Sequence, residues 1–181
     1  MTPGARVAAQ IDILEAILSG VPAEKALTNW ARGNRFAGSK DRAALRDLVF
    51  QALRCRRSAG AWPAPQSARA WAIGTLRANG EDPNEFFTGI AHSPAALCAD
   101  DVTPLPSDRD RLDLQDWVID LLTQQYGAEQ TAKIGAVLRH RAPITLRVNL
   151  QKTTRAQLQA ELAKAEIETA PNLASDTALT V

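Results

Sequence analysis

The sequence has 181 residues, of which 45% are hydrophobic and 23% are charged, a balance typical of a globular protein with a buried core. No apolar stretch approaches the roughly 18–20 residues that span a bilayer, and the charged first twenty residues indicate an amphipathic helix instead of a signal peptide. Because the net charge is only +1 and the two cysteines lack zinc-site spacing, we expect a cytoplasmic protein without a membrane or metal partner.

Helical periodicity predicts four helices before residue 80. Gly20 is expected to end the first helix, and Ser39 is expected to cap the third. The AWPAP segment, residues 61–65, predicts a break before the fourth. The four helices are expected at residues 5–19, from Pro22 onward, at residues 40–57 and at residues 67–79.

The middle of the chain is less regular. Pro83 predicts a short helix, whereas the segment 92–110 is rich in Pro and Asp and predicts only short helical pieces. Asp113 is expected to cap the next helix and Gly127 to end it. A further helix is expected over residues 128–140.

The periodicity changes after Pro143 from the 3.6-residue repeat of helices to the two-residue repeat of strands. Apolar and polar side chains alternate over residues 144–151, which indicates a half-buried strand. Thr153 or Thr154 is expected to cap a helix that follows. Two further strands are expected at residues 167–170 and 178–181.

The sequence therefore predicts a mainly α protein with an all-helical domain at residues 1–142 and a partial α/β subdomain at residues 143–181. A strand–helix–strand unit buries too little surface to close a core of its own. Because the chain also ends on an apolar strand, we expect it to be the front part of a longer protein. The alternative is that the last strand pairs within this chain.

The near-neutral net charge conceals two basic blocks on either side of an acidic one. Residues 32–57 contain eight basic and two acidic residues, and residues 81–120 contain ten acidic and two basic residues. Residues 132–155 contain six basic residues and no acidic residue. Phosphate is a natural partner for the basic blocks, because its neutralisation releases condensed counterions. The alternative is that the blocks balance one another across the fold.

Two parts of the chain resemble known families. The run GSKDRAALRDLVFQALRCRR, residues 38–57, resembles the central helix of NusB-like domains. The runs LQDWVIDLLTQQYG and APITLRVNLQKTTRAQLQAELAKAEIETAP, within residues 114–171, resemble the Fmu/Sun family of bacterial 16S ribosomal RNA cytosine-C5 methyltransferases. The positions that carry this second resemblance are Trp117, Tyr126, Gly127, Pro143, Leu146, Arg147, Val148, Asn149, Lys152, Thr153 and Arg155.

The resemblance implies a NusB-like helical domain, a ferredoxin-like RNA-binding subdomain and a methyltransferase domain that binds S-adenosylmethionine and attacks cytosine with a cysteine. This sequence has no Gly-rich methyl-donor turn, and neither Cys55 nor Cys98 follows a Pro or Thr as the family's catalytic cysteines do. We therefore expect these residues to hold no cofactor and no catalytic site. They would instead position ribosomal RNA for a downstream methyltransferase domain.

RNA binding is predicted for basic residues of both basic blocks and for one neighbouring asparagine. These residues are Arg42, Arg46, Arg54, Arg57, Arg139, Arg141, Arg147, Asn149 and Lys152. Arg147 and Asn149 share a strand face, which meets either RNA or the catalytic domain. The alternative for Arg54, Arg56 and Arg57 is pairing with the acidic block.

Two other functions stay open. A stand-alone NusB-like adaptor would bind RNA and a protein partner in transcription antitermination, although the strand-bearing segment argues against it. A purely structural helical module would leave both basic blocks unexplained. A reading frame that continues past Val181 into a Gly-rich loop and a Pro-Cys motif would favour the methyltransferase.

Overall fold

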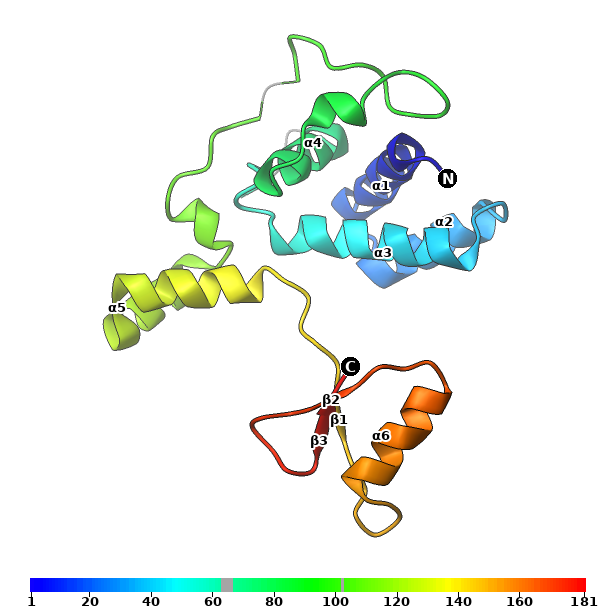
Figure 1. The fold of residues 1–181 in the computed structure, drawn as a ribbon. Helices are drawn as coiled ribbons and strands as arrows, with labels where there is room; N and C mark the ends of the chain where they lie inside the picture. The colour runs from blue at the N-terminus through cyan, green and yellow to red at the C-terminus, as the bar shows by residue number, and fades with distance from the viewer. Residues whose placement is uncertain (63–66, 102) are drawn as a thin grey trace. The chain divides into compact units, whose positions relative to one another are not determined.

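The computed structural model describes residues 1–62, 67–101 and 103–181, and the chain forms two compact units, Met1–His140 and Arg141–Val181 (Figure 1). The first unit is helical, and the second contains a small antiparallel sheet with one helix. The predicted fold class, a mainly α protein with a small α/β part at its end, is confirmed. Across the described ranges, no helix has both the length and the apolar character needed to cross a membrane.

The four helices predicted before residue 80 are present. Thr2 caps the first and Ser67 the fourth, each accepting a hydrogen bond from a first-turn backbone N–H. The third helix is capped by Gly38 instead of Ser39, which already belongs to the helix. The break predicted at residues 61–65 falls mainly on residues outside the described ranges. The helices are α1 (Pro3–Leu18), α2 (Ala23–Gly33), α3 (Ser39–Arg54, which ends three residues earlier than predicted) and α4 (Ala68–Ala78).

The main core lies where α1, α3 and α4 pack together. Trp71 of α4 is buried at its centre, and its indole N–H donates to the carbonyl of Ala52 on α3 at 3.1 Å. The indole therefore contributes a large apolar surface without leaving its polar atom unsatisfied. A smaller cluster of Ile13, Ala26 and Val49 joins α2 to α1 and α3.

The segment between α4 and α5 contains little helix, as the sequence predicts. Its described residues, 79–101 and 103–115, form two single helical turns, η1 (Pro83–Glu85) and η2 (Asp110–Leu112). Arg69 of α4 holds the intervening loop, because its Nε and Nη2 both donate to Asp101, at 2.7 and 2.8 Å. The same guanidinium lies over the ring of Phe87, 4.6 Å from its centroid.

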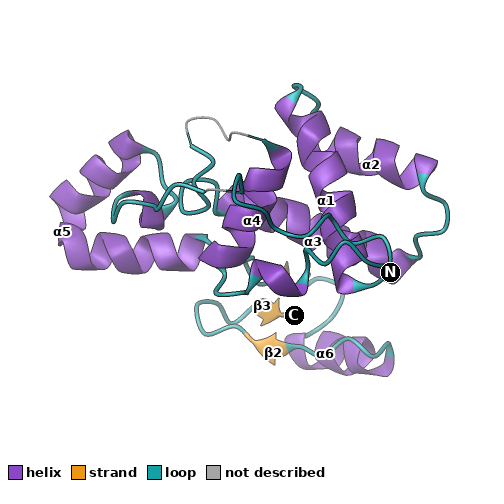
Figure 2. Ribbon diagram, turned by 90° about the horizontal axis from the view of Figure 1, so that it is seen from above, coloured by secondary structure: helices purple, strands orange, loops and turns teal. Residues whose placement is uncertain are grey.

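The last helix of the first unit, α5 (Asp116–Leu138), is bent at Gly127. Gly127 has φ 79° and ψ 164°, outside the helical region, so α5 consists of two arms that meet at an angle (Figure 2). This break confirms the predicted helix end. The predicted cap is wrong, because Gln115 occupies the N-cap position, whereas Asp113 has a left-handed conformation with φ 53°.

In the second unit, three short strands form a sheet in the order β1-β3-β2, with antiparallel neighbours. Leu146 lies opposite the fully buried Leu179, and Val148 is also buried, as the alternation predicts, whereas Ile144 and Leu150 of the same predicted face are exposed. Thr154 caps the helix reciprocally with Gln157. The strands are shorter than expected, and the elements are β1 (Thr145–Arg147), α6 (Arg155–Lys164), β2 (Ala170–Pro171) and β3 (Ala178–Thr180).

Gly74 of α4 allows a close approach that a methyl group would prevent. A Cβ at this position would clash with the backbone carbonyl of Ala59. We expect Gly74→Ala to lower the free energy of unfolding by about 1–3 kcal/mol, measured by urea denaturation. Gly33→Ala is the matched control, because no atom lies within 4 Å of its Cβ position. Equal stability of the two variants would show that Gly74 does not lie in close contact with the backbone of Ala59.

The pair of Arg69 and Asp101 predicts a dependence of stability on pH. The Arg69 guanidinium holds the pKa of Asp101 far below its usual range. Because the folded-state pKa is lowered, the pair's contribution is present above the unfolded value of about 4 and is lost as pH falls. Asp101→Asn should therefore lower stability at neutral pH and flatten its decline below about pH 4, measured by urea unfolding. Asp100→Asn, at an exposed neighbour, should change neither.

Candidate nucleic-acid interface

The residues predicted to bind RNA occur in three environments. Arg42 and Arg46 lie exposed on the first half of α3. Three other arginines of the helical unit, Arg54, Arg57 and Arg139, are held by contacts within that unit. The second unit contains Arg141, Arg147, Asn149 and Lys152, all of them exposed.

Arg42 and Arg46 present guanidinium groups beside the contact between α2 and α3. Arg42 donates from Nε to the Ala37 carbonyl at 2.9 Å. Arg46 pairs with Glu24 at 2.8 Å, and both side chains are 58% exposed. An ion pair this exposed contributes little stability, so Arg46 can exchange Glu24 for a phosphate at small cost. The two arginines also line a shallow cavity of about 170 Å³ with Trp30.

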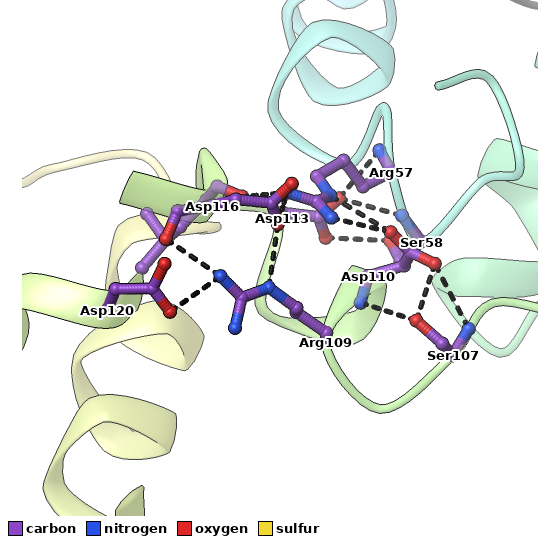
Figure 3. Close-up of polar contacts among 9 residues, drawn as sticks. Arg57, Ser58, Ser107, Arg109, Asp110, Asp113, Asp116 and Asp120 are labelled. Atoms are coloured by element: carbon purple, nitrogen blue, oxygen red, sulfur yellow. Dashed lines mark hydrogen bonds and ion pairs between the residues drawn. The ribbon is translucent and has the colours of Figure 1, made fainter. Parts of the chain in front are cut away.

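Arg57 is committed to the acidic block. It donates to Asp110 at 2.8 and 3.0 Å, to Asp116 at 2.9 Å and to the carbonyl of Leu114 at 2.6 Å (Figure 3). Only 10% of its side chain is exposed. Asp116 also accepts from Arg109, so the acidic carboxylates and both arginines form one network. For Arg57, the sequence left RNA binding and pairing with the acidic block as alternatives, and the structure shows the pairing.

Asp113 is the most buried carboxylate of this network, with 2% of its side chain exposed. Its Oδ1 accepts from the backbone N–H groups of Arg57 and Ser58, at 3.0 and 2.8 Å, and its Oδ2 accepts from the Ser58 hydroxyl at 2.7 Å. Arg139 lies 3.0 Å from the same Oδ2. Burial raises the pKa of Asp113, whereas the hydrogen bonds from Ser58 and the charge of Arg139 act in the opposite direction.

Arg139 and Arg54 join the ends of three helices. Arg139 donates to the Ala78 carbonyl at the end of α4, at 3.2 Å, as well as pairing with Asp113. Arg54 donates from Nε to the Arg139 carbonyl at 3.1 Å and from Nη2 to Gln51. Residues from the two separate basic blocks of the sequence therefore meet inside the helical unit.

Neither Arg56 nor the cysteine beside it forms a reactive site. Arg56 lies over the ring of Trp71, at 5.3 Å from its centroid, and donates to the Ala61 carbonyl. Cys55 is fully buried, and burial raises the pKa of its thiol to about 11. In the described part of the chain, no three His, Cys, Asp or Glu side chains are grouped so as to hold a metal.

In the second unit, Arg147 and Asn149 line one open cavity of about 480 Å³. The carboxamide oxygen of Asn149 accepts from the backbone N–H of Gln151 at 3.1 Å, which shapes the turn after β1. Arg147 is exposed, since the neighbouring Val148 takes the buried side. The structure thus brings the two residues to one cavity, although Asn149 lies in the turn after β1 and Val148 and Leu150 line the same cavity.

Four lining residues of this cavity were not among the predicted site residues, and they are Val148, Leu150, Gln151 and Thr177. Gln151 continues the two-residue alternation of Arg147 and Asn149, so the signal for it was present in the sequence. Thr177 has no such signal, because it reaches the cavity through the pairing of β1 with β3, and strand pairing depends on tertiary structure.

Comparison with known protein families supports the resemblance that was found for the later part of the chain. Residues 114–181 match the family model described as the RsmF/B-like methyltransferase ferredoxin-like domain. The match includes α5 and the whole second unit, and it agrees with the methyltransferase resemblance of those residues. A search of curated proteins found no match. The NusB-like resemblance of residues 38–57 stays a prediction.

Removal of the Asp113 carboxylate should destabilise the helical unit. Asp113→Ala leaves the Arg139 guanidinium and the donors of Arg57 and Ser58 without their acceptor in a buried site. We expect a loss of about 2–4 kcal/mol in the free energy of unfolding, measured by chemical denaturation. Asp108→Ala removes a fully exposed carboxylate of the same loop and should have no measurable effect. If both variants lost comparable free energy of unfolding, the contacts of Asp113 would not be what stabilises the helical unit.

Proposed function

We propose that this chain is the RNA-binding front part of an S-adenosylmethionine-dependent ribosomal RNA cytosine-C5 methyltransferase, and that it positions RNA for a catalytic domain. The single observation that carries the proposal is the family match of residues 114–181 to a ferredoxin-like domain of RsmF/B-like methyltransferases. The helical unit before it would be the NusB-like domain of the same protein, and the compartment would be the cytoplasm.

The residues of this sequence do not form a binding site for a methyl donor. The sequence has neither a G-x-G-x-x-G turn nor a Pro-Gly-Gly-Lys turn. The buried Cys55 thiol, with its raised pKa, is a poor nucleophile. S-adenosylmethionine and the catalytic cysteine would therefore belong to the methyltransferase domain, and the residues described here would only bind and orient RNA.

On the helical unit, Arg42 and Arg46 are the residues we assign to phosphate binding. They are exposed, and their contacts with the Ala37 carbonyl and with Glu24 leave guanidinium N–H groups available. Lys40 lies exposed on the same half of α3. Arg54, Arg57 and Arg139 would contribute indirectly, because their contacts fix the helices that present this surface.

On the second unit, Arg147, Asn149 and Lys152 would form the RNA-binding surface, with Arg141 beside them in sequence. Arg147 and Asn149 line the open cavity described above, which also contains the exposed apolar side chain of Leu150. A cation, an amide and an apolar surface together suit an unpaired nucleotide better than a uniform duplex backbone. The family match of this unit favours the methyltransferase over a stand-alone NusB-like adaptor.

The phosphate-binding role of α3 predicts a change in salt dependence. Arg42→Ala combined with Arg46→Ala should weaken binding of a labelled ribosomal RNA hairpin, measured by fluorescence anisotropy over a range of salt concentrations. Each lost phosphate contact should reduce the slope of log K against log salt by about 0.7–0.9. Lys133→Ala combined with Lys164→Ala removes two exposed cations outside the proposed set and is the control. An unchanged slope in the arginine variant would exclude α3 as a phosphate site.

A further inference from the structure

An aromatic pair lies beside the two arginines of α3 that we assign to phosphate binding. The rings of Trp30, in α2, and Phe36, in the loop between α2 and α3, lie edge to face, with centroids 6.4 Å apart and an interplanar angle of 75°. Trp30 is half-buried, whereas Phe36 is 73% exposed although it is large and apolar. Phe36 therefore presents an open aromatic surface to solvent.

Two contacts connect this pair to the arginines. Trp30 lines the shallow cavity that Arg42 and Arg46 also line. Arg42 donates from Nε to the carbonyl of Ala37, the residue next to Phe36, at 2.9 Å. The two rings and the two guanidinium groups are therefore neighbours at the junction of α2 and α3.

The segment that carries Phe36 is strongly basic. Residues 30–46 contain five basic residues and one acidic residue, Asp41. The Asp41 carboxylate accepts from the Met1 amino group at 3.2 Å and from Arg6 at 2.8 and 3.1 Å, so groups outside this segment neutralise it. The basic residues, all of them exposed, are Arg32, Arg35, Lys40, Arg42 and Arg46. This charge complements a polyanion better than it complements a basic or neutral partner.

We propose that Phe36 stacks on an unpaired base of the RNA, while Arg42 and Arg46 bind the phosphates beside that base. The inference rests on the proposed RNA-binding function and names the class of RNA that this surface takes, a single-stranded loop or end. Aromatic rings among cations bind single strands, because every base has a π face and every nucleotide carries a phosphate. In a duplex the bases stack on one another and cannot reach a protein ring.

The acidic residue nearest to this arrangement affects where the phosphates lie. Phe36 and Trp30 also line a groove that contains Asp12 of α1. A base is neutral, so it can lie near this carboxylate, whereas a phosphate there would be repelled. The base would therefore lie over Phe36, and the phosphates would lie at Arg42 and Arg46 of α3.

The test uses the whole chain and two RNAs with the same number of phosphates, a hairpin with an unpaired loop and a fully paired duplex. Binding is measured by the anisotropy of a terminal dye over a range of salt concentrations. The hairpin loop carries the fluorescent base 2-aminopurine, whose emission falls when it stacks. We expect the hairpin to bind several times more tightly than the duplex, with a fall in 2-aminopurine emission.

Phe36→Leu keeps an apolar side chain but removes the ring. We expect this variant to weaken hairpin binding by about fivefold or more and to reduce the quenching of 2-aminopurine. Its duplex affinity and its salt slope should not change, because no phosphate contact is lost. Phe36→Trp retains an aromatic ring and should restore hairpin affinity. Tyr126→Leu, which removes a different exposed ring on α5, is the matched control and should change neither affinity.

The outcomes separate this inference from the proposed function. If the chain binds the hairpin and Phe36→Leu binds it equally well, stacking on Phe36 is wrong, whereas RNA binding stands. If neither RNA binds, the proposed function fails as well. Equal losses of hairpin and duplex affinity in Phe36→Leu would also overturn the preference for an unpaired base. Self-association of the protein that Phe36→Leu abolishes, with unchanged RNA affinity, would show that a second copy covers the ring.

Discussion

The buried carboxylate of Asp113 fixes the second half of the helical unit. It accepts hydrogen bonds from the turn after α3 and pairs with Arg139 at the end of α5. A carboxylate removed from water needs such partners to stay charged. Because α5 buries few side chains, among them Ile119 and Thr131, these polar contacts are an important part of its attachment. Arg57 extends the network to Asp110 and Asp116.

This network shows that part of each charged block of the sequence forms ion pairs within the fold. Part of the first basic block neutralises part of the acidic block within the fold, which accounts for Arg57 and its aspartates. The second basic block also contributes, since Arg139 meets Asp113. The arginines left exposed, among them Arg42 and Arg147, are those available to a phosphate partner. Burial thus separates the arginines that hold the fold from those that we propose bind phosphate.

Local patterns predicted most of the secondary structure correctly. The helices of the first eighty or so residues, the break at Gly127 and the burial of Val148 follow from periodicity and glycine conformation, which act over a few neighbouring residues. Arg147 and Asn149 line one cavity because the chain turns there after β1, so Val148 and Leu150 line it as well. The boundaries were less accurate, and α3 ends at Arg54 because the turn after it is held by Asp113, a distant residue.

The sequence by itself determined the helical character of the first unit and the change to strands after Pro143, but it did not fix which apolar side chains are buried, because Val137 and Leu150 of the expected buried stripes are exposed. Only the tertiary structure decided that Asp113 is an acceptor instead of a helix cap, that Arg139 joins Arg54, and that Phe36 and Asp12 border one groove. The physical reason is the range of the interactions. Periodicity tells which side of an element is buried, whereas the partner of a buried or charged group is chosen by the packing of segments far apart in the chain.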